Sequence, residues 1–384
     1  MRIIVFGAGR VGAAIARDLA AEEDFEVTVA DIDADALQKL RGVRGLTTVK
    51  ADLRTVEMVT RLAGAHDLVV GAVPGPMGYG TVHSAIQAGR DIVDISFFEE
   101  DPYPELDEFA RRHGVMVLTD CGIAPGFSNL VVGTAQADMD SVERFECRVG
   151  GLPVVREEPF EYKAVFSPID VIAEYTRPAR LVEDGEIVVR EALSGLELID
   201  FEGVGTLEAF NTDGLRTLLR LDIPNMKEKT FRYPGHAEKM RLLRDTGFFS
   251  PEPLDFHGFQ LSPLEMTIRL LFPAWQLKEG DRDLTAMRME IEGLKDGRRI
   301  LRKYELLDHY DGRSDVTSMA RTTGYTCTAI VRLVAGGYFR KEGVHAPEVV
   351  GGCKGCFERV VEDLGERGIV VTQEELILEE NRRP

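Results

Sequence analysis

The chain has 384 residues, and 46 basic residues against 65 acidic ones give it a net charge of −19. This length predicts two or three domains. An acidic surface repels phosphate backbones and anionic lipids, so we expect neither a nucleic acid nor a membrane as partner. No stretch approaches the roughly 18 consecutive apolar residues of a membrane-spanning helix.

The N-terminus and the cysteines predict a cytoplasmic protein. Met1 and Arg2 lead directly into a short apolar run, without the regions of a secretion signal. Five cysteines, an odd number, are typical of a reducing compartment. Cys353 and Cys356 form a lone CxxC pair, and a zinc site needs further ligands at suitable spacing. We therefore expect reduced thiols and no metal.

The first third of the sequence alternates apolar runs with segments of helical periodicity. The runs predict strands at residues 3–6, 27–30, 46–49, 67–73, 91–95 and 115–119, and the periodic segments predict helices at 11–19, 55–62, 81–88 and 103–112. Apolar strands separated by helices are typical of a parallel sheet covered on both faces. The fold class is therefore α/β, with an N-terminal doubly wound Rossmann domain.

A glycine-rich turn, Gly7-Ala8-Gly9-Arg10-Val11-Gly12, joins the first strand to the first helix. Gly7 permits the tight turn, Gly9 lets the backbone approach a pyrophosphate, and Gly12 lets the helix pack close to the sheet. The diphosphate would lie against the N–H groups at the helix N-terminus, including those of Arg10 and Val11. This context predicts a dinucleotide-binding site.

Asp31 ends the second predicted strand, where the adenosine ribose of a dinucleotide lies. A carboxylate there accepts hydrogen bonds from the ribose hydroxyls and repels a 2′-phosphate, so the sequence favours NAD over NADP as cofactor. Alternatively, Asp31 is a surface acid that ends a strand. Five further positions follow strand ends along the same crevice and join the predicted cofactor site: Ile32, Asp52, Val73, Pro74 and Ser96. We expect residues 76–80 to form a loop, either bordering the nicotinamide or serving as a turn.

The remainder of the chain has a different character. A Gly/Pro-rich crossing at residues 120–126 precedes a predicted helix at 127–138. Strands are predicted at 142–149, 287–292 and 300–307, the last two joined by the hairpin signal Lys295-Asp296-Gly297. Helices follow at 315–334 and 356–365, with a final short strand at 368–372. We expect a Rossmann domain at residues 1–122, an α+β substrate and oligomerisation domain with a mixed, mostly antiparallel sheet at 123–312, and a C-terminal helical segment at 313–384 that packs back on the first domain.

The sequence resembles the saccharopine dehydrogenase family, and most closely its L-lysine 6-dehydrogenase branch. Six stretches carry the resemblance, which covers almost the whole chain: residues 93–97, 120–129 (DCGIAPGFSN), 150–153 with 162–163, 210–217, 229–236 (KTFRYPGH) and 343–348. Saccharopine reductases carry an acid–His pair where this chain has Ser128 and Asn129, which favours the lysine branch. The resemblance also suggests a homodimer or homotetramer.

The resemblance implies oxidative deamination of the ε-amino group of L-lysine, with NAD accepting the hydride. The imine then hydrolyses to ammonia and 2-aminoadipate 6-semialdehyde, which cyclises to piperideine carboxylate. Two alternatives stay open: an enzyme that acts on saccharopine or another secondary amine, and a nucleotide-binding regulator without catalysis. The reaction needs a base, because the ammonium of lysine, with a pKa near ~10.4, must lose a proton before hydride leaves.

Asp120, Lys163 and His236 are the candidate catalytic groups. Asp120 follows a strand at the crevice face, Lys163 would act as a base if burial lowered its pKa, and His236 would act as base or proton shuttle. Each also has a structural reading: Asp120 as a turn cap, Lys163 as a solvated charge and His236 as a core or capping histidine.

Arg232 is the candidate for binding the substrate carboxylate, because a guanidinium matches it bidentately. A surface salt bridge is the alternative. Tyr162 would line the same site. Asn211, Thr212 and Asp213 would receive the α-amino group or the hydrolytic water, or else serve as turn residues ahead of a helix at 215–221.

Overall fold

The computed structural model describes residues 1–103, 105–164, 168–278 and 280–380. They form two compact units. The first unit combines Met1–Ala137 with Ala320–Ile369, and the second combines Asp138–Met319 with the chain from Val370 onward. The sequence placed the first division after residue 122. The structure places it at the end of α6 (Phe127–Asp138), because this helix packs within the first unit.

The first unit contains a seven-stranded sheet in the order β17-β6-β5-β4-β1-β2-β3, with every pairing parallel. The strands are β1 (Arg2–Phe6), β2 (Glu26–Asp31), β3 (Leu46–Lys50), β4 (Leu68–Gly71), β5 (Asp91–Asp94), β6 (Met116–Leu118) and β17 (Gly343–His345). Residues 3–6 of β1 are completely buried, as expected for a strand covered on both faces. The doubly wound parallel sheet is confirmed, and β17 adds a seventh strand to the six that were predicted.

Helices connect the strands of this unit: α1 (Arg10–Ala20), α2 (Ala34–Gln38), α3 (Val56–Gly64), α4 (Gly75–Gln87) and α5 (Glu105–His113). The prediction of a loop at residues 76–80 is wrong, because α4 already begins at Gly75. Pro74 is the N-cap of α4, and Pro76 lies in its first turn, where a missing N–H breaks no helical hydrogen bond. Gly78 lets α4 approach the segment that follows β5, since a Cβ there would lie 2.6 Å from Cβ of Ser96.

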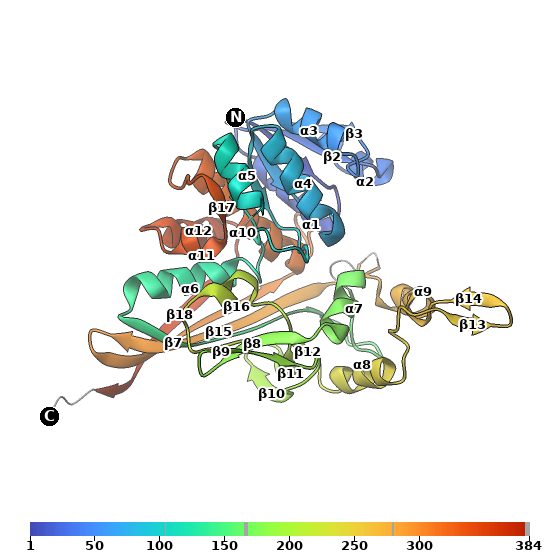
Figure 1. The fold of residues 1–384 in the computed structure, drawn as a ribbon, viewed down its shortest axis with the longest axis vertical. Helices are drawn as coiled ribbons and strands as arrows, with labels where there is room; N and C mark the ends of the chain where they lie inside the picture. The colour runs from blue at the N-terminus through green and yellow to red at the C-terminus, as the bar shows by residue number, and fades with distance from the viewer. Residues whose placement is uncertain (104, 165–167, 279, 381–384) are drawn as a thin grey trace. The chain divides into compact units, whose positions relative to one another are not determined.

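The C-terminal segment of the first unit contains α10 (Ser318–Ala335), α11 (Pro347–Gly351) and α12 (Cys356–Glu366), drawn in orange and red beside the blue elements in Figure 1. Gly324 of α10 lies against α1, because a Cβ there would be 3.2 Å from Cγ1 of Ile15. The helix that opens at the glycine turn is therefore packed directly against α10.

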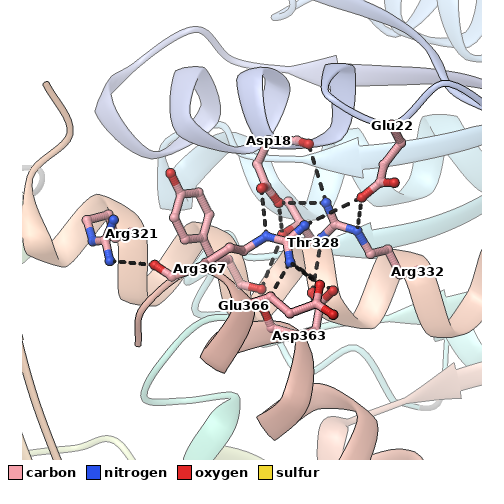
Figure 2. Close-up of polar contacts among 9 residues, drawn as sticks. Asp18, Glu22, Arg321, Thr328, Arg332, Asp363, Glu366 and Arg367 are labelled. Atoms are coloured by element: carbon pink, nitrogen blue, oxygen red, sulfur yellow. Dashed lines mark hydrogen bonds and ion pairs between the residues drawn. The ribbon is translucent and has the colours of Figure 1, made fainter. Parts of the chain in front are cut away.

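An ion network centred on Asp18 joins α1 to α10 and α12 (Figure 2). The carboxylate of Asp18 accepts hydrogen bonds from Nη2 of Arg332 at 2.9 Å and from Nε of Arg367 at 2.7 Å. Asp363 bridges the same two arginines at 3.0 and 2.9 Å, and Glu22 accepts from Nε of Arg332 at 2.8 Å. Asp18 is the most buried carboxylate of this network, with 10% of its side chain exposed.

We expect Asp18→Ala to destabilise the protein strongly, because it removes the most buried carboxylate of the network and leaves two largely buried guanidinium groups to share Asp363 and Glu22. Removing one partner of a buried ion pair costs about 3–5 kcal/mol, equivalent to roughly 6–20 °C in Tm for a unit of this size. Thermal unfolding measures the effect. Glu23→Ala is the control, because Glu23 and its partner Arg44 are both more than 90% exposed. An Asp18→Ala protein as stable as Glu23→Ala would contradict the prediction.

The second unit contains a nine-stranded, mostly antiparallel sheet in the order β10-β11-β12-β7-β15-β16-β18, in which β8 also pairs with β12 and β9 pairs with β8. The strands β12 and β7 pair in parallel. The strands are β7 (Ser141–Pro153), β8 (Ala179–Glu183), β9 (Glu186–Arg190), β10 (Glu197–Phe201), β11 (Gly205–Asn211), β12 (Asn225–Arg232), β15 (Asp283–Lys295), β16 (Arg298–His309) and β18 (Val371–Glu380). The predicted mixed sheet is confirmed. The hairpin signal is also confirmed: Asp296 and Gly297 join β15 to β16 with φ of 51° and 71°.

The remaining elements of this unit are α7 (Pro168–Thr176), the 3-10 helix η1 (Arg216–Arg220), α8 (His236–Asp245), α9 (Pro263–Trp275) and a separate hairpin of β13 (Leu254–Phe256) and β14 (Phe259–Leu261). Residues of α7, α8 and α9 share one apolar cluster with Tyr162 and Phe210. Among the described residues, no helix is both long enough and apolar enough to cross a membrane.

Candidate cofactor and substrate sites

The glycine turn has the geometry that each of its glycines predicts. Gly7 has a φ of +106°, and a Cβ there would lie 2.3 Å from the carbonyl oxygen of Ala72. A Cβ on Gly12 would lie 2.2 Å from the carbonyl oxygen of Gly7. At Gly9, by contrast, a Cβ would meet no described atom within 4 Å. Gly7 and Gly12 are thus required by the protein itself, whereas Gly9 faces open space that a ligand can enter.

The N-terminus of α1 presents backbone donors beside this open space. Gly9 is the N-cap and contributes no side-chain cap, and the first helical hydrogen bond runs from Ala13 N to Gly9 O. The amides of Arg10, Val11 and Gly12 precede that bond, in the turn where helical N–H groups have no intrahelical partner. The positive end of the helix dipole adds to their attraction for a diphosphate.

Asp31 is tied to the glycine turn by backbone hydrogen bonds. Its carboxylate accepts from Ala8 N at 2.6 Å and from Asp33 N at 2.8 Å. The neighbouring Ile32 is an apolar side chain with 52% exposure. The end of β2 therefore presents a fixed carboxylate and an open apolar surface at the position predicted for adenosine.

The other predicted cofactor residues lie at the ends of neighbouring strands. Val73 is buried and Pro74 exposed, directly before α4. Ser96 is buried, and its hydroxyl donates to Asp94 at 3.2 Å. Asp52 forms an exposed ion pair with Arg54, whose side-chain hydrogen bond lowers the pKa of Asp52 to about 2. Ser96 and Asp52 thus both have protein partners.

We expect Gly9→Ala and Gly12→Ala to fail in different ways. The methyl group of Gly9→Ala enters the open space, so stability stays near that of the wild type while the Kd for the dinucleotide rises at least about tenfold. Gly12→Ala drives its methyl group into the Gly7 carbonyl and lowers the free energy of unfolding by about 1–3 kcal/mol. Thermal unfolding and titration calorimetry with the dinucleotide separate the two effects. Equal dinucleotide affinity in Gly9→Ala and wild type would contradict the assignment.

The crossing segment at residues 120–129 forms a tight, buried turn in the first unit. Asp120 is 2% exposed and adopts a φ of 58°. Gly126 has a φ of +137°, and a Cβ there would lie 1.9 Å from the carbonyl oxygen of Gly122. Asp120 therefore holds a fixed position at the carboxyl end of β6.

Asn129 fastens this turn to the C-terminal segment. Its Oδ1 accepts from Gly126 N at 3.0 Å, and its Nδ2 donates to Glu348 Oε2 at 2.9 Å. Ser128 and Asn129 are both fully buried. Two of the stretches that carry the resemblance, 120–129 and 343–348, are thus joined by a structural hydrogen bond. The identity of residues 128–129 consequently gives little information on the substrate.

Arg232, at the end of β12, is a buried cation in the second unit, with 1% exposure. Its Nη2 donates to Glu174 Oε2 at 2.5 Å, its Nε to the hydroxyl of Tyr175 at 3.2 Å and its Nη1 to the Phe231 carbonyl. The guanidinium carbon also lies 4.5 Å from the ring centroid of Tyr162. The surface salt bridge considered for Arg232 is therefore replaced by a buried, aromatic-lined ion pair.

His236 lies beside this pair and is also buried. Its Nδ1 lies 2.9 Å from the Phe160 carbonyl, so Nδ1 carries the hydrogen, and Nε2 accepts from the hydroxyl of Tyr175 at 2.9 Å. Burial, together with the charge of Arg232, lowers the pKa of His236 to about 3. At neutral pH, His236 is a neutral acceptor that orients Tyr175.

Two polar atoms near this cluster have no hydrogen-bond partner among the described residues: the hydroxyl of Tyr162 and Nε1 of Trp275. Both side chains are buried, and their rings meet edge to face with centroids 5.5 Å apart. Buried polar atoms without partners are costly, so they mark places where a water or ligand atom binds. Tyr162 thus combines a packing role with an available donor.

Lys163 is buried at 5% exposure, although it is a lysine. Its Nζ lies 2.8 Å from Glu157 Oε2 and 3.3 Å from the Ala274 carbonyl. Glu157 is more than half exposed, so this pair lies at the edge of the unit. The alternative of a solvated lysine is wrong.

The three polar residues at the end of β11, residues 211–213, do not gather around Arg232. Glu208 is the residue opposite Arg232 in the β11–β12 ladder, and Asn211, an odd number of positions away from Glu208, points to the other face of the sheet. There Asn211 donates to Ser194 at 3.2 Å. Asp213 forms a two-point ion pair with Arg180, with both distances 2.9 Å.

Thr212 accepts a hydrogen bond from Thr230 at 3.1 Å, and both hydroxyls are buried. The geometry of residues 211–213 matches the turn and packing alternative. The helix that follows is shorter than the predicted 215–221 and is the 3-10 helix η1.

Sequence reasoning missed the residues that surround Arg232: Glu174, Tyr175, Glu208 and Trp275. Glu208 accepts from Gly235 N at 2.8 Å and Ala237 N at 2.5 Å, which caps the helix that begins at His236. An acid between Leu207 and Ala209 was its only sequence signal. Trp275 is the single tryptophan of the chain, but nothing in the sequence relates it to Arg232.

We expect the buried, neutral His236 to make stability depend on pH. The pKa of His236 rises from about 3 to its ordinary ~6.5 on unfolding. Below pH ~6.5 the unfolded chain therefore takes up a proton that the native protein does not bind. The free energy of unfolding consequently decreases as the pH is lowered. Relative to His236→Gln, the wild type should lose about 2 kcal/mol between pH 7 and pH 5 in urea unfolding.

The control for this pH series is His309→Gln, because His309 is exposed. Its stability should follow the wild type over the same pH range. Parallel pH curves for the wild type and His236→Gln would contradict a depressed pKa at His236.

Both halves of the chain match family models of known proteins. A family model of the saccharopine dehydrogenase NADP binding domain matches residues 3–118, and one of the saccharopine dehydrogenase C-terminal domain matches residues 122–369. The saccharopine dehydrogenase (NADP(+), L-glutamate-forming) of Pyricularia oryzae is 24% identical over 86% of this chain and 90% of its own. The carboxyaminopropylagmatine dehydrogenase of a Synechocystis strain is 24% identical over 89% of this chain and 91% of its own.

Among solved structures, the apo saccharopine dehydrogenase (L-Glu forming) from Saccharomyces cerevisiae matches with a TM-score of 0.80 at 19% identity, covering 98% of this chain and 99% of that one. The parallel sheet and glycine turn define a protein with a nicotinamide dinucleotide-binding domain. The chain belongs to the saccharopine dehydrogenase family.

Proposed function

We propose that this protein is an NAD-dependent L-lysine 6-dehydrogenase. The ε-carbon of L-lysine loses a hydride to NAD⁺, and the resulting imine reacts with water to give ammonia and 2-aminoadipate 6-semialdehyde, which cyclises to piperideine carboxylate. The observation that carries the proposal is the buried guanidinium of Arg232, already bound by one carboxylate. We place the carboxylate of lysine there, in exchange with Glu174.

The supply of buried cations favours a substrate with one carboxylate over saccharopine, which has three. The buried cations of the second unit, as far as it is described, are Arg148, Lys163, Lys229, Arg232 and Arg302. Each already pairs with a protein carboxylate. Binding three substrate carboxylates there would disrupt several of these pairs, whereas lysine requires one exchange.

The preference for NAD over NADP rests on Asp31. Its carboxylate is held by two backbone amides and cannot turn away without losing both hydrogen bonds. A 2′-phosphate at this ribose position would meet a fixed negative charge at short range. A ribose 2′-hydroxyl, by contrast, would donate to the same carboxylate.

The remaining roles in the proposed reaction fall to residues of this chain. Bound NAD⁺ supplies the hydride acceptor, and the glycine turn and α1 hold its diphosphate. Lys163 and Asp120 are our candidates for removing the proton of the substrate ammonium. His236 acts through Tyr175, because its low pKa opposes protonation and its hydrogen bond fixes the direction of the Tyr175 hydroxyl.

A saccharopine-type enzyme acting on a secondary amine is the second candidate function. The names of the Pyricularia and Saccharomyces relatives favour it. A regulator without catalysis is a third possibility within the same fold. The buried ion pair of Arg232 argues against it, because desolvating two charges is costly and rarely improves stability over an apolar pair.

We expect the purified protein to reduce NAD⁺ with L-lysine at pH ~9–10, where more of the ε-amine is neutral. NADH absorbance and ammonia release follow the reaction, and NADP⁺ should support a much lower rate. Turnover confined to saccharopine, or to lysine with 2-oxoglutarate and NADH in reverse, would establish the second candidate. Absence of turnover with all of these amines would favour the regulator.

The carboxylate site is tested by a pair of variants. Arg232→Lys loses the forked donor geometry, and KM for lysine should rise at least about tenfold, with a smaller change in kcat. Glu174→Gln removes the competing anion at nearly constant volume, and KM should fall. An unchanged KM in Arg232→Lys would remove Arg232 from this role.

A further inference from the structure

Two unpaired hydrogen-bond donors belong to the aromatic cluster around Arg232. They are Nε1 of Trp275 and the hydroxyl of Tyr162, which have no partner among the described residues. Their side chains are 0% and 2% exposed, so water outside the protein does not satisfy them. A buried donor without an acceptor costs free energy, which indicates that something from outside the chain supplies the acceptor.

Trp275, the last residue of α9, is fixed in this cluster by its ring and by its backbone. Its ring meets those of Tyr162 and Tyr175 at steep angles, with centroids 5.5 and 6.4 Å apart. Its carbonyl accepts a hydrogen bond from Ala164 N at 2.8 Å. The same two tyrosine rings lie 4.5 and 5.9 Å from the guanidinium carbon of Arg232. The single tryptophan of the chain therefore packs against both rings that flank the buried cation.

The neighbouring acceptors are already used by other donors. The Phe160 carbonyl lies 2.9 Å from Nδ1 of His236, and Nε2 of the same ring accepts from the Tyr175 hydroxyl. The Phe231 carbonyl accepts from Nη1 of Arg232. A water bound to the two unpaired donors would need acceptors for its own hydrogens, whereas an ionised carboxylate only accepts. The surplus of donors in this cluster therefore favours a carboxylate over a water.

The ion pair of Arg232 meets solvent on the side of Glu174. The Glu174 side chain is 25% exposed, whereas Arg232 is buried. Desolvation raises the pKa of Glu174 despite the nearby guanidinium. A Glu174 displaced by another carboxylate can therefore take up a proton, so that the exchange does not leave two anions side by side.

Both unpaired donors keep their hydrogens at alkaline pH, where more of the ε-amine of lysine is neutral. An ordinary tyrosine has a pKa near ~10 and begins to ionise in this range. Burial raises the pKa of Tyr162 well above its ordinary value, so its hydroxyl remains a donor. The indole N–H of Trp275 is a donor only and does not titrate there.

We infer that Trp275 is a substrate-binding residue, whose indole N–H donates, together with the Tyr162 hydroxyl, to the carboxylate that Arg232 receives from the substrate. This inference deepens the proposed function and rests on it only in taking the ligand of Arg232 to be a carboxylate. Three kinds of donor then bind one carboxylate, each of them buried. The site consequently selects L-lysine over cadaverine, the diamine that lacks only this carboxylate, because cadaverine leaves all three donors unpaired.

The fluorescence of Trp275 reports directly on this site, because the chain has no other tryptophan. L-Norleucine has the head group of lysine but no ε-amine, so it binds without being oxidised there. In the protein saturated with NAD⁺, it should shift the tryptophan emission to longer wavelength, since Nε1 gains a charged acceptor. Pentylamine, which is L-norleucine without the carboxylate, should leave the emission unchanged. The same spectrum with both ligands would overturn the inference.

Two altered proteins each remove one donor at nearly constant volume. They are Tyr162→Phe and a protein in which benzothienylalanine, an analogue without the N–H, replaces Trp275. Each should raise the Kd for L-norleucine at least about tenfold in titration calorimetry. Both should keep the Tm of the wild type, because neither atom has a protein partner to lose.

The matched control is Tyr233→Phe, because the buried hydroxyl of Tyr233 donates to the Pro153 carbonyl at 2.9 Å. Its Tm should fall while its Kd for L-norleucine stays that of the wild type. The opposite pattern, with lowered Tm and unchanged Kd in Tyr162→Phe and in the benzothienylalanine protein, would give both donors a purely structural role and overturn the inference.

Failure of this inference and failure of the proposed reaction have different signatures. Tighter binding of L-norleucine to the wild type than to both donor-free proteins, in a protein that oxidises no amine, would support the carboxylate site and contradict the lysine reaction. Turnover of lysine with an unchanged Kd in both donor-free proteins would overturn the site and leave the reaction in place.

Discussion

The first unit depends on the buried ion network of Asp18. Apart from this network, the contact described above between α1 and the C-terminal helices is the apolar packing of Gly324 against α1. In the network, one carboxylate of α1 receives arginines from both α10 and the end of α12. Because α1 begins at the glycine turn, the same network holds the helix whose N-terminus faces the dinucleotide. The cofactor site is thus supported by a segment more than 300 positions later in the sequence.

The second unit also contains a buried charge, the guanidinium of Arg232. Its neighbours are a carboxylate, a tyrosine hydroxyl oriented by a neutral histidine, and an aromatic ring. Such a group costs more in desolvation than an apolar residue would, so its retention needs a reason other than stability. The proposed recognition of a substrate anion would supply that reason, with Glu174 occupying the carboxylate position in the absence of substrate.

The parallel sheet, the glycine turn and the hairpin at Lys295-Asp296-Gly297 were predictable from sequence, because each depends on periodicity or on local backbone geometry. The start of α4 was not, because two prolines and three glycines at residues 74–80 are typical of a loop, whereas Pro76 occupies the first helical turn without cost. The residues of the proposed substrate site were still harder to predict from sequence. Arg232 and His236 were recognised by residue type, but Tyr175 and Glu174 join them through a contact across about 60 residues, and strand alternation turns Asn211 to the opposite face.

The family-like stretches of this sequence consequently differ in what they say about function. Residues 120–129 and 343–348 are joined by the bond between Asn129 and Glu348, so a change at either position would first affect the packing of the first unit. Residues 229–236 contain both Arg232 and the start of a helix capped by Glu208, so they combine scaffold with chemistry. Substrate specificity is therefore better inferred from the balance of buried charges than from these stretches. Each buried cation of the second unit described above already has a carboxylate partner. In the proposed mode of binding, a substrate displaces one such partner for every anionic group that it places against these cations. That requirement favours the substrate with the fewest carboxylates.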